Sequence, residues 1–241
     1  MAGMINRLFM GSLFLLIAPV AISGGYDRQN NSSFSAAEAL HLNKRDRQFV
    51  ESYIQDNRRI LFHIKQKGQS RFTIADAVLH KYGLPPQLKY LAVIESDLKS
   101  NAVSRVGAVG PWQLMPETAR LLGLKVTDDQ DERTQFGKST RAAARHLKDL
   151  FSEYGDWLLV LAAYNGGEGP VNHAIRKAGN RNFWLLQNYL PAESRDHVKK
   201  FIATLYYFEG PSSAAAFSRA AAPAPLITAQ SSYQKRTTGL D

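Results

Sequence analysis

The chain has 241 residues, a formal net charge of +9 and no cysteine. The absence of cysteine excludes disulfide bonds, a thiolate nucleophile, cysteine-ligated zinc and a lipid anchor on an acylated cysteine. The positive charge favours anionic partners, but the basic residues are scattered and form no run of five or more, so we expect no nucleic-acid-binding arm. The length suits one domain with tails.

The N-terminus has the pattern of a signal peptide. Arg7 precedes the apolar stretch 8–18, and small residues follow at Ala21 and Ser23. The stretch is shorter than the roughly 20 apolar residues that span a bilayer, although an uncleaved anchor stays open as the alternative. We therefore expect residues 1–23 to direct export to the periplasm, which argues against a nucleic-acid partner.

Helical periodicity runs through most of the remaining chain. We expect helices over about 46–67, 73–80, 86–98, 136–154, 157–164 and 191–208, and one more beginning near Gly169. No segment alternates as a strand does, so the predicted fold class is all-α. The expected organisation is a linker at 24–45, one helical domain at 46–209 and a disordered tail at 210–241, which is rich in Ala, Ser and Pro.

One acidic residue lies on an apolar stripe of the predicted helix 86–98. Leu88, Leu91, Ala92 and Glu95 follow one another at helical spacing. Desolvation disfavours the charged form of a carboxyl group, so such a group can keep its proton near neutral pH. A general acid that breaks a glycosidic bond needs this property. From the helix alone, a partly exposed Glu in a cap or a salt bridge is the alternative.

Three motifs follow one another along the chain. They are Glu95-Ser96, the segment 107–116 with Trp112-Gln113 at its centre, and Tyr164-Asn165 within 162–167. Their order and separation resemble the lytic transglycosylases, lysozyme-like enzymes of glycoside hydrolase family 23, over roughly residues 50–208. The membrane-bound lytic transglycosylase D type is the closer resemblance, because of the upstream helix, the step at 83–85, the Trp before Gln113 and the segment 156–159.

The resemblance implies roles for particular residues. Glu95 matches the catalytic acid that later acts as a base, and Ser96 matches a residue that positions the substrate or the Glu. Gln113 matches a hydrogen-bonding group of the sugar groove. The Tyr164 hydroxyl is implied to approach the catalytic carboxyl, and Asn165 to help hold the groove.

Trp112 marks a departure from the family pattern, since Pro111-Trp112 stands where Leu-Met is common. This puts the shape of the groove in doubt. Trp112 either stacks on a sugar ring or packs in the core, and the sequence favours neither.

The implied reaction uses a single carboxyl group. In the family the substrate's N-acetyl group stabilises the charge that develops at C1 of N-acetylmuramic acid. The 6-hydroxyl of the same sugar then attacks C1, so the β-1,4 bond to N-acetylglucosamine breaks without water and leaves a 1,6-anhydro end. Asp97 is expected to point to another face of the helix than Glu95.

Two other functions stay open: a hydrolytic muramidase of the same fold, and a non-catalytic protein that binds or assembles peptidoglycan. The six histidines form no pair at i, i+4, and no glycine-rich phosphate loop follows a strand, so neither metal nor cofactor is expected. The expected partner is the peptidoglycan glycan strand, and the expected oligomeric state is a monomer.

Overall fold

The computed structural model describes residues 42–220, and within them every regular element is a helix. This confirms the all-α class. The α-helices are α2 (Lys44–Lys67), α3 (Gln69–Lys81), α4 (Leu91–Ser96), α5 (Pro116–Leu121), α6 (Phe136–Tyr154), α7 (Trp157–Gly166), α8 (Glu168–Ala178), α9 (Phe183–Leu186), α10 (Ala192–Glu209) and α11 (Pro211–Ala220). The 3-10 helices are η1 (Pro86–Tyr90), η2 (Glu132–Thr134) and η3 (Gln187–Tyr189).

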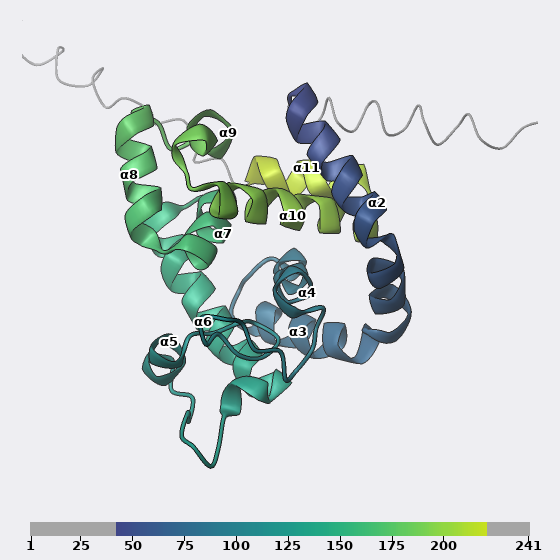
Figure 1. Cartoon of the computed structure of the whole chain (residues 1–241), viewed down its shortest axis with the longest axis vertical. Coiled ribbons are helices and arrows are strands. Elements are labelled where there is room, and N and C mark those ends of the chain that lie inside the picture. Colours follow the sequence, from purple (N-terminus) through teal and green to yellow (C-terminus); the bar gives the residue numbers. More distant parts are fainter. Residues whose placement is uncertain (1–41, 221–241) are drawn as a thin grey trace, which may run out of the picture.

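Helix α10 is the central packing element of the fold. It crosses the upper part of Figure 1 and contacts α2, α4, α7 and α11. Its inward stripe includes Val198, Phe201, Ile202 and Leu205, all fully buried. Because α4 and α7 both pack against this helix, their ends are held in fixed positions relative to it.

A buried ion pair joins the start of α2 to α10. Lys199 Nζ lies 2.6 Å from Asp46 Oδ1. Asp46 Oδ2 also accepts hydrogen bonds from Gln187 at 3.1 Å and Asn43 at 2.8 Å. A buried charge is tolerated when it is paired and its remaining lone pairs are bonded, so this cluster fixes where α2 begins.

The segment expected as one helix over 86–98 is shorter and has two parts. Pro86 opens it as the 3-10 helix η1, and α4 ends at Ser96. Asp97 and Leu98 then adopt left-handed backbone angles, with φ of 55° and 62°. Asp tolerates this region better than Leu does, and Leu98 is held there by burial. The chain therefore turns sharply directly after Glu95-Ser96.

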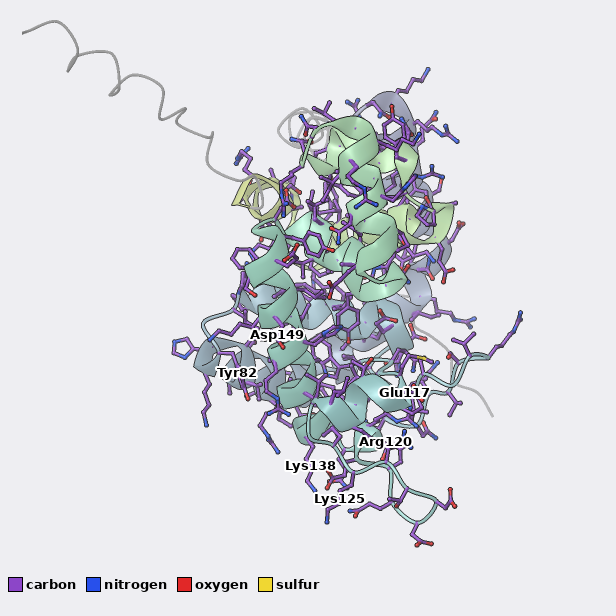
Figure 2. The ribbon with its side chains drawn as sticks, turned by 90° about the vertical axis from the view of Figure 1, so that its left-hand side faces the viewer. Tyr82, Glu117, Arg120, Lys125, Lys138 and Asp149 are labelled. Atoms are coloured by element: carbon purple, nitrogen blue, oxygen red, sulfur yellow. The ribbon has the colours of Figure 1, made fainter. Side chains whose placement is uncertain are left out.

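The segment between α4 and α6, which includes α5 and η2, is held by buried charged groups. Arg133 donates from Nη1 to the carbonyls of Gly107 and Leu114, both at 3.0 Å. Glu132 accepts from the Lys125 backbone and from Lys138 Nζ at 2.9 and 2.5 Å, and these two lysines lie near each other at the lower end of Figure 2. The loop that carries the second motif therefore has a defined conformation.

The prediction of a disordered tail over 210–241 is wrong for the first part of that segment. Pro211–Ala220 forms α11, and Ala214, Ala215 and Phe217 are buried, with Phe217 against Phe201 at 5.1 Å between ring centroids. The small residues that suggest disorder here allow close packing against α10. The predicted signal peptide, most of the linker and the rest of the tail lie outside the described residues. Across 42–220, no helix is both long enough and apolar enough to span a membrane.

Candidate active site

Glu95 occupies the last turn of α4, where its side chain is 14% exposed. Its carboxylate Oε1 lies 2.9 Å from Nε2 of His197, which comes from α10 and has a side chain only 7% exposed. An ionised carboxylate can only accept, so Nε2 carries the hydrogen when Glu95 is ionised. Glu95 is thus neither in a purely apolar niche nor in a surface salt bridge, because an imidazole from another helix holds one oxygen.

His197 is the residue of this candidate site that sequence reasoning misses. The spacing between histidines indicates only metal-binding pairs, and no other histidine lies at such a spacing from His197. Its position one residue before the buried Val198, on the inward side of α10, is the signal that identifies it as buried. Its second nitrogen, Nδ1, is also buried, and within residues 42–220 it has no hydrogen-bond partner. Within these residues, the contact with Glu95 is therefore the one hydrogen bond that the imidazole makes.

Ser96 ties the end of α4 to the second motif. It is 8% exposed, and its hydroxyl lies 2.9 Å from the Pro111 carbonyl and 3.2 Å from the Ala92 carbonyl. The hydroxyl donates to backbone within the protein instead of facing solvent. Of the two roles that the resemblance implies, this geometry supports positioning of the Glu95 turn over contact with the substrate.

Gln113 is partly exposed and sits at a tight turn of the second motif. Its backbone is left-handed, with φ of 46°, and its amide nitrogen donates to the carbonyls of Gly110 at 2.8 Å and Ala102 at 3.3 Å. A left-handed Gln is strained, and such residues concentrate at functional sites. Gly110 is required beside it, since φ is +87° and a Cβ would collide with the Arg133 carbonyl.

Tyr164 brings the third motif to the other two. Its hydroxyl donates to the Trp112 carbonyl at 2.7 Å. Burial first, and the nearby Glu95 charge second, raise the pKa of Tyr164 well above its ordinary value. The phenol therefore stays protonated and close enough to Glu95 to sense its charge. Asn165 follows on α7 and is partly exposed.

Trp112 is a correction. It was a candidate for stacking on a sugar ring, but it is 0% exposed, and its indole nitrogen donates to the Thr140 hydroxyl at 2.9 Å. A ring with no exposed surface cannot receive a sugar, so Trp112 packs in the core. It anchors the second motif to α6 through this hydrogen bond.

Asp156 sets the start of the helix that carries Tyr164. Its carboxylate accepts from the backbone N–H groups of Leu158 and Leu159 at 2.8 and 3.1 Å, which caps α7. Burial raises the pKa of Asp156 to about 7, against the lowering effect of the two backbone hydrogen bonds. The start of α7 is thus capped by a carboxyl group whose burial disfavours its ionised form.

The site therefore joins a partly buried carboxyl from α4, an imidazole from α10 and a phenol from α7, beside a braced polar loop. Residues 73–187 match the family model of the transglycosylase SLT domain. These residues are therefore a transglycosylase SLT domain.

Curated relatives carry related names. The chain is 34% identical over 166 residues to membrane-bound lytic murein transglycosylase D of Escherichia coli, which covers 67% of this chain and 36% of that protein. It is 39% identical over 117 residues to a peptidoglycan transglycosylase of Escherichia phage T7, covering 48% of this chain and 9% of that protein. The chain thus spans about a third of the transglycosylase D relative.

Two solved structures share the fold. An inactive mutant of lytic transglycosylase Slt from Pseudomonas aeruginosa aligns with a TM-score of 0.51 at 21% identity. The 70 kDa soluble lytic transglycosylase of Escherichia coli aligns with a TM-score of 0.52 at 18% identity. Each alignment covers 76% of this chain and 33% of the other. The lysozyme-like fold expected from the sequence is confirmed.

Proposed function

We propose that this chain is a peptidoglycan lytic transglycosylase in which Glu95 is the single catalytic acid and base. The observation that carries the proposal is the convergence of Glu95 with His197 and Tyr164, from three helices, within an SLT domain. The relatives named for murein and peptidoglycan supply the substrate class.

In the first step, protonated Glu95 donates its proton to the glycosidic oxygen, and the bond between C1 and that oxygen breaks. The substrate's own N-acetyl group stabilises the positive charge at C1. In the second step the 6-hydroxyl of the same sugar attacks C1, and the Glu95 carboxylate takes up its proton. Glu95 returns to its starting state, and no water is consumed.

The position of Asp97 supports a mechanism with one carboxyl group. Two-carboxylate glycosidases need a second Asp or Glu across the scissile bond. Asp97, the acid nearest to Glu95 in sequence, leaves α4 in a left-handed turn and pairs with Lys99 at 3.0 Å. It is therefore directed toward its own loop.

His197 fits the double duty of Glu95. A hydrogen bond from Nε2 to one carboxylate oxygen restrains the rotation of the carboxyl group and leaves the other oxygen for the substrate. Tyr164, kept protonated by burial, adds a neutral neighbour that does not compete for the proton.

The test is the mass of the products. Purified protein is incubated with isolated sacculi, and the released muropeptides are read by mass spectrometry. Fragments lighter by one water than the hydrolytic products support the lyase. Fully hydrated fragments move the protein to the muramidases, and binding without any fragment leaves a wall-binding protein. Export to the periplasm belongs to the same proposal and is tested by localising the chain after expression.

A further inference from the structure

A basic cavity lies beside the turn that follows Glu95. Its volume is about 460 Å³, within the range typical of ligand pockets. Four cationic side chains line it, Arg59, Lys67, Arg71 and Lys99, with one carboxylate, Asp97. Asp97 is already paired with Lys99 at 3.0 Å. The remaining lining charge is positive.

The wall of this cavity comes from α2, which lies before the residues that match the SLT family model. Arg59, His63 and Lys67 stand at i, i+4 and i+8, so they form one stripe along the exposed face of α2. Buried Ile64 and Leu98 form the floor beneath them. The cavity therefore combines an apolar floor with a cationic rim, as a site for an amphipathic anion does.

The cavity is close to the proposed chemistry. Asp97 is two residues after Glu95, and two residues of chain span at most about 7 Å. The muramic acid residue whose bond breaks at Glu95 carries the stem peptide, and a chain of several residues is long enough to reach the cavity from there. That peptide extends over several residues, carries free carboxylates and has apolar side chains.

We propose that the cavity binds the carboxylate-bearing stem peptide of peptidoglycan, a site contributed largely by α2. This rests on the function proposed above. Guanidinium groups bind carboxylates through paired hydrogen bonds, and Arg59 and Arg71 supply two such groups at the rim. The glycan would occupy the groove at Glu95 and Gln113, and the peptide the cavity beside it.

The experiment compares two substrates and two charge-reversal variants at one ionic strength. The substrates are soluble glycan strands with their stem peptides, and the same strands after an amidase has removed the peptides. The test variant is Arg59→Glu with Lys67→Glu. The matched control is Arg141→Glu with Lys148→Glu. Both residues are exposed and lie on the same stripe of α6 as Lys138 and Asp149. Figure 2 shows Lys138 and Asp149 on the outer surface.

The test variant should lose about tenfold or more in kcat/KM on peptide-bearing strands and nothing on denuded strands, since two attractive charge pairs become repulsive only when the peptide is present. The control should lose the same small factor on both. An equal loss on both substrates, or no loss on either, would overturn the proposal. Circular dichroism shows whether both variants fold.

Calorimetric titration of the free stem tetrapeptide separates this inference from the enzyme assignment. Binding to wild type that is lost in Arg59→Glu with Lys67→Glu supports the cavity even if the protein cleaves neither substrate. Absence of tetrapeptide binding to wild type, together with full lytic activity, leaves the enzyme assignment intact and removes the peptide site.

Discussion

His197 Nε2 lies 2.9 Å from Glu95 Oε1, and the two residues are 102 positions apart in sequence. The contact links α10 to α4 across the interior of the fold. Both side chains are largely buried, so solvent screens the interaction little. This bond makes His197 a positioning residue for the proposed acid, and it has measurable consequences.

Replacement of His197 with Phe should lower kcat by roughly 10- to 100-fold with KM nearly unchanged, because the carboxyl group loses its restraint but the sugar groove stays. His197→Gln, which keeps an N–H donor, should recover part of kcat. Steady-state kinetics on soluble glycan strands measures both. If His197 acts only in packing, the two variants will follow their thermal stabilities and not their ability to donate.

Trp112→Phe should destabilise the fold by about 1–3 kcal/mol, because it removes the hydrogen bond to Thr140 and leaves space in a fully buried site. KM should stay within a factor of two at temperatures where the variant is folded. Urea unfolding and kinetics test this. Unchanged stability with a clearly raised KM would restore the sugar-stacking interpretation.

The raised pKa of Asp156 predicts how the stability of the fold depends on pH. Its folded pKa of about 7 lies above the ordinary 3.8, so the folded state favours the proton more than the unfolded state does. The associated stability is present below pH 4 and is lost as pH rises toward 7. Between pH 4 and pH 7, the free energy of unfolding of Asp156→Asn should therefore rise relative to that of wild type by roughly 4 kcal/mol, at about 1.4 kcal/mol per pH unit. Urea unfolding at several pH values measures this difference.

Exposed Asp149→Asn is the control for Asp156→Asn, and its stability should track wild type at every pH. Parallel pH profiles for Asp156→Asn and wild type would show that burial of Asp156 is offset by its two backbone hydrogen bonds.

Lys199→Met should cost about 3–5 kcal/mol, because it leaves the Asp46 carboxylate buried without its cation. Asp46→Asn combined with Lys199→Met should recover part of the loss, since no unpaired charge remains. Lys200→Met, at the exposed neighbouring position, should stay within about 0.5 kcal/mol of wild type. Additive effects of the two substitutions would contradict the pairing.

Local signals predicted much of the fold. The apolar period of α6 predicted its bounds, 136–154, because one face of that helix is buried and the other is solvated. The early end of α4 was not predicted, since the left-handed turn at Asp97 and Leu98 depends on burial of Leu98 against other elements. Helix α11 was missed because Ala and Ser carry no periodic signal, and its packing against α10 and α7 is not visible in the sequence.

The candidate site divides in the same way. Glu95, Gln113 and Tyr164 lie in short motifs that a sequence can show. The Glu95 partner His197 comes from a helix distant in sequence, and only the packing of α10 against α4 brings the two together. The hydrogen bond of buried Trp112 to Thr140 in α6 is likewise a contact between distant segments, which no local pattern indicates.

Replacement of Glu95 tests the central claim most directly. Glu95→Gln keeps the size of the side chain and removes its acid, and Glu117→Gln is the matched control, at an exposed position that Figure 2 shows on the outer surface. We predict that the release of anhydro-muropeptides from sacculi falls by at least about 1,000-fold in Glu95→Gln, with folding retained, and is unchanged in Glu117→Gln. A folded Glu95→Gln protein with wild-type lytic activity would contradict the account.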